Sequence, residues 1–488
     1  MKGEPGGVVT LAKATSHIAG FDEILHGGLP EGRTTLVEGG PGTGKSVLAL
    51  EFLYRGAMLG EPGIFIAFEE RATAVRRNAL TLGWDLEAAE KAGKLAIIDA
   101  RLSPQTVVSG DFNINALLAI IDGQSRAIGA KRIVFDALDV LMRLYDNPIR
   151  ERGEMYSLYE WLLDHGMTAI LTVKASEAPD VFRAYEILEY TADCVIRLIQ
   201  RPGEWISTRE LQVIKFRGSD FGRNAYPFVI QEGGIRVIPI SEFGMVHAAM
   251  GPFLPSGNAG LDRILGGGYR RGSSVLIAGT SGTGKTTTSN TFVKAACDRG
   301  EKVLCLAFEE SEEALVEEML SPGIDLRPAI KSGRLMVESA MPEAHGTEKH
   351  LVRSFSLIDT FKPDHVVVDA ISSFERMGTT RAAFEFALRL VHLCKHKGIT
   401  TILVNQSAGG PGERMSISGL GVSSTVDAIL WLRFLDTGTQ LKRALLAIKS
   451  RGAKHSTQYH DFSITDDGIE VSEESLVNRR AKAGGVVR

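Results

Sequence analysis

The chain contains the stretch Gly39-Gly40-Pro41-Gly42-Thr43-Gly44-Lys45-Ser46, and 240 residues later it contains Gly279-Thr280-Ser281-Gly282-Thr283-Gly284-Lys285-Thr286. Each stretch is a complete GxxxxGK[ST] phosphate loop between a short apolar run and a helix-like segment, at 47–58 and at 287–296. The glycines let backbone N–H groups turn toward β- and γ-phosphates, and Lys45 or Lys285 adds a mobile positive charge. The Ser46 or Thr286 hydroxyl can ligate Mg²⁺. The two loops therefore predict two sites for ATP and Mg²⁺.

The bulk composition is that of an ordinary globular protein. The 488 residues predict two or three domains, with a typical balance of 44% hydrophobic and 23% charged residues. A net charge of −4 argues against nucleic acid as a partner. No apolar run approaches the ~20 residues that span a bilayer, and the first residues lack the apolar core of a secretory signal. Four cysteines without CxxC spacing predict buried, reduced thiols. We therefore expect a cytoplasmic protein with no membrane partner.

The two halves of the chain repeat each other. The segment 18–29 is echoed by 258–269, and Asp22 and Asp262 are 240 residues apart, like the two loop lysines. Further on, Asp136 and Asp369 are 233 residues apart, so the register slips by only seven residues, as in a tandem duplication. Glycine and proline cluster at 251–257, as in a linker. We expect one domain at residues 1–245, a second at 246–473 and a short disordered tail at 474–488.

Short β-branched runs alternate with longer helical stretches in both halves. Near-continuous apolar runs between helices are typical of strands buried on both faces, so the pattern predicts an α/β fold with a mostly parallel sheet in each half. The runs lie at 34–37, 64–67, 95–98, 132–135, 169–173 and 194–198, and at 274–278, 303–307, 335–337, 365–368, 401–404 and 428–432. An antiparallel edge hairpin is predicted at 210–215 with 226–231, and at 443–449 with 459–464.

Acidic side chains follow two strands of each predicted sheet. The strands that end at Asp136 and Asp369 match the Walker B pattern, whose carboxylate holds Mg²⁺ opposite the loop hydroxyl. The second strand of each half ends in Glu69-Glu70 or Glu309-Glu310. Because ligands bind at the carboxyl edge of a parallel sheet, one carboxylate of each pair could act as a general base. A solvated acidic turn is the alternative, and the identical placement in both halves favours catalysis.

Two basic residues end a hairpin strand late in each half, in Lys215-Phe216-Arg217-Gly218 and Lys449-Ser450-Arg451-Gly452. Alternate positions of a strand point to one side, so each Lys and Arg can act together. They could sense a γ-phosphate or act as an arginine finger. A finger of this kind normally serves the site of a neighbouring subunit, which predicts a ring. A solvated basic strand end is the alternative.

These motifs resemble those of the KaiC family of clock ATPases and autokinases. The similarity rests on the tandem halves, the two phosphate loops, the Phe-Glu-Glu after the second strand and the Lys-x-Arg-Gly pattern, and it runs from about Thr15 to about Glu473. It implies two tandem RecA-like P-loop NTPase domains and a double-ring homo-hexamer with ATP between subunits. In the family, the first ring is a slow ATPase, and the second phosphorylates its own Ser and Thr residues.

The resemblance also implies roles for individual residues. Ser423 and Ser424 fall at the two phosphorylation positions of the family, where the first half has Glu189 and Tyr190. Without the resemblance, these serines would be turn or cap residues. Glu309 or Glu310 would take the proton of the acceptor hydroxyl, and Glu69 or Glu70 would activate water in the first half. The remaining implied contacts are Glu309 with the metal, and Arg443, His455, Lys449, Ser450, Arg451, Lys215, Phe216 and Arg217 with nucleotide.

Two stretches depart from the family pattern. Ser321-Pro322-Gly323 stands where the family has a tryptophan near the adenine, which removes an expected stacking partner. The segment 474–488 is short and basic, whereas the family has a long C-terminal segment that KaiA grips. The short tail argues against activation of the kind that KaiA gives, whereas the resemblance as a whole implies a KaiB-like protein partner.

Two other functions fit parts of the sequence. A RecA- or DnaB-like DNA motor needs basic channel loops, but the segment 405–421 has only Arg414 as a basic residue, and its first-half counterpart has Lys174 and Arg183 among acidic neighbours. A signalling ATPase that hydrolyses ATP without phosphorylating itself fits the same catalytic residues. Formation of a phosphoprotein distinguishes it from an autokinase.

Overall fold

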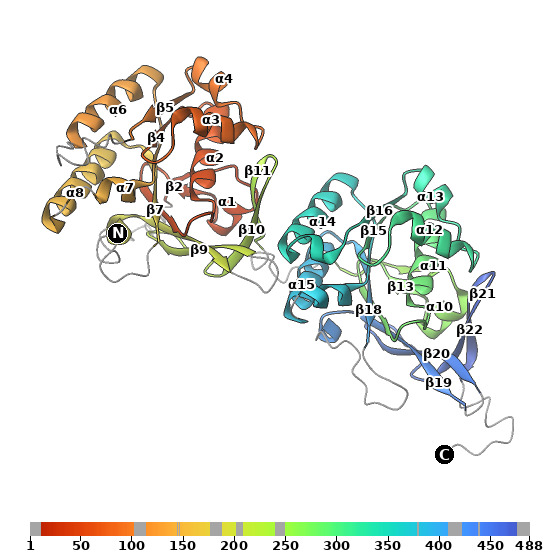
Figure 1. The fold of residues 1–488 in the computed structure, drawn as a ribbon. Coiled ribbons are helices and arrows are strands. Elements are labelled where there is room, and N and C mark those ends of the chain that lie inside the picture. The colour runs from red at the N-terminus through yellow and green to blue at the C-terminus, as the bar shows by residue number, and fades with distance from the viewer. Residues whose placement is uncertain are drawn as a thin grey trace, which may run out of the picture. The chain divides into compact units, whose positions relative to one another are not determined.

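The computed structural model describes residues 11–101, 114–143, 145, 147–175, 188–201, 208–239, 249–377, 380–407, 422–437 and 440–475. The chain divides into two units on either side of residues 240–248 (Figure 1). The boundary expected at residue 245 lies outside the described residues, as do Arg183, Arg414 and the tail from residue 476 onward.

The first unit is built on a nine-stranded sheet of order β11-β10-β9-β8-β3-β7-β6-β4-β5. Strands from β8 to β5 run parallel, and β8, β9, β10 and β11 pair antiparallel. The strands are β3 (Thr34–Gly39), β4 (Gly63–Ala67), β5 (Leu95–Asp99), β6 (Arg132–Asp136), β7 (Thr168–Lys174), β8 (Cys194–Arg201), β9 (Thr208–Phe216), β10 (Ala225–Gln231) and β11 (Gly234–Val237), with a small sheet of β1 (Lys13–Ala14) and β2 (Leu29–Pro30). The helices are α1 (Phe21–Ile24), α2 (Lys45–Met58), α3 (Ala72–Leu80), α4 (Leu86–Lys91), α6 (Ile114–Ile128), α7 (Leu138–Met142) and α8 (Pro148–His165).

The second unit repeats this topology in the order β16-β15-β17-β18-β14-β19-β20-β21-β22. Its strands are β14 (Ser274–Gly279), β15 (Val303–Ala307), β16 (Leu335–Ser339), β17 (His365–Asp369), β18 (Thr400–Gln406), β19 (Ala428–Asp436), β20 (Leu441–Ser450), β21 (His460–Thr465) and β22 (Gly468–Ser475), with a small sheet of β12 (Phe253–Leu254) and β13 (Tyr269–Arg270). Its helices are α10 (Ala259–Ile264), α11 (Lys285–Asp298), α12 (Glu312–Leu320), α13 (Arg327–Lys331), α14 (Thr347–Phe361) and α15 (Thr380–His396), with 3₁₀ turns η2 (Pro342–Ala344), η3 (Ile371–Met377) and η4 (Val422–Ser424).

The structure confirms the predicted α/β fold and adds elements to it. Every apolar run lies in a strand, and both hairpins form at the antiparallel edge, between β9 and β10 and between β20 and β21. The sequence analysis missed the outermost strands β11 and β22 and the two small sheets. Strand β22 ends at Ser475, two residues beyond the expected end of the second domain at residue 473.

The central strands are buried on both faces, as their sequences predict. Val37 packs in the core with helices α2, α3 and α4, while its neighbour Leu36 packs in the core with α6, α7 and α8 on the other face (Figure 1). All four cysteines are free and buried, which confirms the prediction for them. Among the described helices, none combines the length and the apolar character needed to cross a membrane.

A buried charged side chain ties α2 to the sheet in the first unit. Arg132, at the start of β6, is only 2% exposed. Its guanidinium donates to Phe52 O at 2.8 Å, Thr15 O at 2.9 Å and Glu61 Oε2 at 2.6 Å. A buried guanidinium is stable only while its donors have partners. Arg132 therefore links α2 and the segment before α1 to β6, an inner strand of the sheet.

We expect Arg132→Met to lower the free energy of unfolding of the first unit by about 3 kcal/mol, because the buried Phe52 O and the partly buried Thr15 O and Glu61 carboxylate all lose their donor. Denaturant-dependent hydrogen exchange of the β6 amides measures this change. The control is Arg126→Met, because Arg126 is 80% exposed in its ion pair with Asp122 and should contribute less than about 1 kcal/mol. Equal effects of the two substitutions would contradict the assignment.

Candidate functional site

Each phosphate loop connects the central strand of its sheet to a long helix. In the first unit, the loop follows β3 and reaches Gly44, whose φ of 103° is in the left-handed region, and α2 begins at Lys45. The Lys45 ammonium donates to Gly39 O at 2.8 Å and to Gly40 O at 2.9 Å. Thr43 Oγ1 closes the loop with a 2.9 Å bond to Gly40 O. Helix α2 therefore presents its N-terminus to whatever the loop encloses.

The second loop repeats this geometry. Gly284 has a φ of 97°, and α11 begins at Lys285. Lys285 Nζ donates to Thr280 O at 2.9 Å, and Thr283 Oγ1 donates to the same carbonyl at 2.8 Å. A Cβ added to Gly279 would lie 2.3 Å from Leu432 O, so only glycine fits where the loop leaves the strand. Burial lowers the pKa of both loop lysines.

The Walker B aspartate of the first unit bonds to the loop. Ser46 Oγ donates to Asp136 Oδ1 at 3.0 Å, and Thr172 Oγ1 donates to the same oxygen at 2.7 Å. Burial raises the pKa of Asp136, and the two hydroxyl bonds oppose that rise. The structure thus brings together the hydroxyl and the carboxylate that the sequence predicts for the metal.

The second Walker B aspartate has an unused oxygen. Thr286 lies close enough to Asp369 to oppose the rise in its pKa, and Asp369 Oδ2 is buried without a hydrogen-bond partner. Burial raises the pKa of Asp369 to about 7, and the nearby carboxylates of Glu309 and Glu310 add to the rise. A buried carboxylate oxygen beside a hydroxyl is the hard donor set that Mg²⁺ prefers. The residues present therefore fit a magnesium ion.

The paired glutamates lie at the same edge of the sheet. The chain leaves β15 beside β17, because Phe308 N donates to Asp369 O at 2.8 Å, and this places Glu309 and Glu310 next to the loop. Glu309 is exposed and accepts from Ser373 Oγ at 2.8 Å. Burial and the nearby Glu318 raise the pKa of Glu310, and a raised pKa makes its carboxylate a stronger proton acceptor.

The first unit has the same arrangement. Phe68 N donates to Asp136 O at 3.3 Å, and Glu69 and Glu70 follow as exposed side chains. Glu70 Oε2 accepts from Asn78 Nδ2 at 3.3 Å. Two carboxylates therefore stand beside each loop, where sequence reasoning expects a general base.

The basic pair of the first unit holds a backbone segment of its own chain. Lys215 Nζ donates to Glu189 O at 2.8 Å and to Tyr190 O at 2.9 Å, and Arg217 donates to Tyr190 O at 2.6 Å. The side chain of Phe216, between them, is buried in the core, so only its backbone could meet a nucleotide. The nucleotide contact expected of Phe216 stays a prediction for its backbone.

The basic pair of the second unit holds the predicted phosphorylation segment. Lys449 Nζ donates to Ser423 O at 3.1 Å and to Val426 O at 2.6 Å, and Arg451 donates to Ser424 O at 3.2 Å. Sequence reasoning missed these contacts. One sequence signal could have pointed to them: in each unit the lysine lies 26 residues after the first residue whose carbonyl it binds, Lys215 after Glu189 and Lys449 after Ser423.

The basic pairs and the phosphate loops lie at opposite ends of the parallel strands: the loops at the C-terminal ends and the basic pairs at the N-terminal ends. Strand β19 pairs parallel to β14 from Val275 opposite Ala428 to Gly279 opposite Leu432. The loop leaves β14 after Gly279, whereas Ser424 precedes the first residue of β19. At about 3.3 Å per residue, the paired strands alone separate the two places by roughly 13 Å. A chain's basic pair therefore does not reach the loop of the same unit.

Arg443 reaches the loop from the other end of β20. Its Nε donates to Gly282 O at 3.1 Å. Arg209 makes the corresponding contact in the first unit, with 3.2 Å to Gly42 O, and sequence reasoning missed it. The expected His455 lies in the turn between β20 and β21, and its Nε2 is buried without a hydrogen-bond partner. Arg443 thus contacts the loop of its own unit, whereas His455 has a ring nitrogen without a partner beyond the opposite end of β20.

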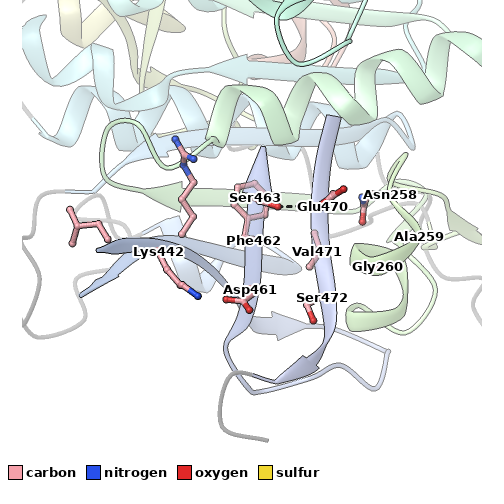
Figure 2. A pocket seen from close by; sticks show the side chains of 12 residues that line it. Asn258, Ala259, Gly260, Lys442, Asp461, Phe462, Ser463, Glu470, Val471 and Ser472 are labelled. Atoms are coloured by element: carbon pink, nitrogen blue, oxygen red, sulfur yellow. Dashed lines mark hydrogen bonds between the residues drawn. The ribbon is translucent and has the colours of Figure 1, made fainter. Parts of the chain in front are cut away.

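A cleft of about 760 Å³ opens where β20 and β21 separate (Figure 2). The two strands pair only at Ala444 with Asp461 and at Leu445 with His460, and beyond them they diverge. Figure 2 shows the Ser463 hydroxyl bonded to Glu470 on one wall, at 3.3 Å. The lining residues are Asn258, Ala259, Gly260, Leu441, Lys442, Arg443, Asp461, Phe462, Ser463, Glu470, Val471 and Ser472. Through Arg443, the cleft borders the second phosphate loop.

Comparison with known proteins decides the family. A family model described as the KaiC ATPase matches residues 14–242 and again residues 254–475. The chain belongs to the KaiC ATPase family. It is 37% identical over 468 residues to the circadian clock protein KaiC2 of Synechocystis sp., which covers 95% of this chain and 82% of that protein. It is 32% identical over 480 residues to the circadian clock oscillator protein KaiC of Synechococcus elongatus, which covers 98% of this chain and 92% of that protein.

The two matches of the KaiC model coincide with the two units of the structure. Each match contains one phosphate loop, one Walker B aspartate and one pair of glutamates. Membership in this ATPase family implies that the loops bind ATP. It also confirms the prediction of two tandem RecA-like domains.

We expect Asp369→Asn to stabilise the protein at pH 8 when no metal or nucleotide is bound. Burial raises the pKa of Asp369 from 3.8 to about 7, so the folded protein keeps a proton that the unfolded chain loses. Stability therefore falls as the pH rises through this window, and above pH 7 the whole penalty, on the order of a few kcal/mol, is present. The substitution removes the penalty.

Thermal unfolding in EDTA, between pH 5 and pH 8, measures this effect. The advantage of Asp369→Asn should shrink as the pH falls, because the wild-type side chain becomes neutral as well. Asp359→Asn is the control, since Asp359 lies in an exposed ion pair with Lys397. A variant less stable than wild type at pH 8 would contradict the expectation.

Proposed function

We propose that this KaiC-family chain is an ATP-driven clock or signalling protein, in which the first unit hydrolyses ATP and the second phosphorylates Ser423 and Ser424. The observation that carries the proposal is the grip of Lys449 and Arg451 on the backbone of both serines. Ser424 is exposed and Ser423 is half-buried, so the segment offers its hydroxyls at the surface. The names of its clock relatives support the wider role, and a KaiB-like protein is the partner that we propose with it.

In the proposed transfer, the serine oxygen forms a bond to the γ-phosphorus while the bond to the β–γ bridging oxygen breaks. ADP leaves, and the hydroxyl proton passes to Glu309 or Glu310. Lys285 and the backbone of the loop hold the phosphates, with Arg443, Ser450 and His455 as further nucleotide contacts. In the first unit, Glu69 or Glu70 takes a proton from water instead, and the loop from Gly39 to Ser46 holds the phosphates.

Magnesium has a defined place in this scheme. Ser46 and Asp136 would hold it in the first unit, and Thr286, Asp369 and Glu309 in the second. There it would neutralise charge on the β- and γ-phosphates as the terminal group is transferred. The chain itself contributes the orientation of the hydroxyl and the carboxylates.

In this proposal, the acceptor serines receive phosphate from the nucleotide bound at the loop of another copy. Ser424 and the loop of its own unit lie at opposite ends of the parallel strands, which favours transfer between chains. Lys215 and Arg217 in the first unit, and Lys449 and Arg451 in the second, would then face a neighbour's γ-phosphate. Repetition of this contact around a closed circle gives the proposed homo-hexamer with two rings.

A signalling ATPase without autophosphorylation is the second candidate. The first unit carries the same grip through Lys215 and Arg217, although Glu189 and Tyr190 stand at the acceptor positions. The grip is therefore compatible with hydrolysis alone. A DNA motor is disfavoured by the net charge of −4.

We expect Glu309→Gln/Glu310→Gln to abolish phosphate on Ser423 and Ser424 while ATP still binds. Incubation of the purified protein with Mg·ATP, followed by intact and peptide mass spectrometry, measures this. The matched control is Glu312→Gln/Glu313→Gln, which removes two carboxylates at the start of α12. Free phosphate without any modified serine in the wild type would leave the signalling ATPase and remove the autokinase.

A mixing experiment tests transfer between copies. One variant, Lys285→Ala, keeps the serines and loses the loop lysine, and the other, Ser423→Ala/Ser424→Ala, keeps the loop. Alone, each should stay unmodified. After mixing, we expect phosphate on the Lys285→Ala chain, because its serines reach a working loop in its neighbour. Phosphorylated Lys285→Ala chains before mixing, or none after it, would contradict transfer between chains.

A further inference from the structure

Three basic residues donate to every carbonyl of the proposed acceptor segment, residues 423–427, to four of them from side chains and to one from a backbone N–H. Lys449 Nζ donates to the carbonyls of residues 423 and 426, and the Arg451 side chain donates to that of residue 424. The Arg451 N–H takes the carbonyl of residue 427 at 2.9 Å. The remaining one, Thr425 O, accepts from Lys395 Nζ at 3.1 Å. Lys395 thus completes the grip from a helix, α15, that carries no motif.

Lys395 is also half of a buried ion pair. Its Nζ lies 2.8 Å from Asp427 Oδ2, and the two side chains are only 13% and 8% exposed. The same carboxylate oxygen accepts from the N–H and the hydroxyl of Ser274, both at 2.9 Å. A charge-assisted bond in such a place holds its geometry far better than a surface pair does. Asp427 is therefore bonded to Ser274 at the start of β14, and Lys395 ties this end of the segment to α15.

The first unit lacks this residue. Helices α8 and α15 are followed by glycines in the left-handed region, Gly166 with φ 59° and Gly398 with φ 70°. Lys395 lies three residues before Gly398, and Leu163 lies three residues before Gly166. Leu163 is 43% exposed and cannot donate a hydrogen bond.

A different residue anchors the first segment. Asp193 is the counterpart of Asp427, and Arg33 binds it at 3.2 Å from the start of β3. Ser273 stands at the position of Arg33 in the second unit. The fold therefore does not require a lysine on the helix, and the lysine occurs in the unit that carries the two acceptor serines.

We propose that Lys395 is a positioning residue for phosphoryl transfer, which sets how Ser423 and Ser424 enter the neighbouring site and so which hydroxyl is modified. The inference rests on the proposed autokinase function. Transfer requires the acceptor oxygen within about 3–3.5 Å of phosphorus, and a displacement of about 1 Å can lower the rate about 100-fold. Without the Lys395 ammonium, Thr425 O loses its donor and Asp427 loses an ion-pair partner. The residues before Asp427 can then shift by that amount while Lys449, Arg451 and Ser274 keep the segment attached.

Lys395→Met tests the inference in the full-length chain, because methionine keeps the length of the stem and loses the charge. With saturating Mg·ATP, we expect the phosphorylation rate to fall at least about tenfold with an unchanged KM for ATP. Peptide mass spectrometry should show an altered Ser423 to Ser424 ratio and new phosphate on Thr425. If this variant does not fold, Lys395→Gln, which keeps one donor, is judged by the same two outcomes.

Lys397→Met is the matched control. Lys397 follows the same helix and pairs with Asp359 at 3.0 Å, but the two side chains are 39% and 46% exposed. It should behave like wild type. A wild-type rate and distribution in Lys395→Met would overturn the inference and leave the autokinase standing, and so would a uniform loss with the ratio unchanged. Absence of phosphate in the wild type would overturn the autokinase and the inference with it.

Discussion

The placement of a loop hydroxyl beside the Walker B aspartate, two strands away, is the constraint on which each unit depends. In the first unit it is a hydrogen bond from Ser46 to Asp136 at 3.0 Å, and in the second Thr286 stands at the same position and opposes the rise in the pKa of Asp369. This placement joins the N-terminus of the long helix to the Walker B strand across an intervening strand. Burial of the carboxylate costs free energy in the absence of ligand, but it creates a site where Mg²⁺ and phosphate can bind. The glutamates and the loop lysine take their positions around this pair of side chains.

The sequence predicts those parts of the site that are local. A phosphate loop contains its own turn, and a Walker B strand is a run of neighbouring apolar residues, so both can be recognised without the fold. The grip of Lys449 on Ser423 and the contact of Arg209 with Gly42 join residues that are 26 and 167 positions apart. Only pairing of the strands brings them together. The burial of the Phe216 side chain likewise depends on the packed sheet and cannot be told from the motif.

Duplication leaves the frame intact and changes single contacts within it. The buried Arg132 of the first unit gives way to His365 in the second, which bonds to Glu301 at 3.0 Å. The anchor of the acceptor segment passes from Arg33 to Lys395. In both cases, the loop and the sheet order stay the same. Two units with one topology can therefore take on different work through a few buried charges.

The placement of loop and basic pair at opposite ends of the parallel strands has a consequence for how activity depends on assembly. Under the proposed arrangement, each copy gives its serines to one neighbour and its nucleotide to the other. A closed circle then has as many complete sites as chains, an open arc has one fewer, and a lone chain has none. Activity per molecule would rise with protein concentration, and dilution would act as an inhibitor without any second ligand.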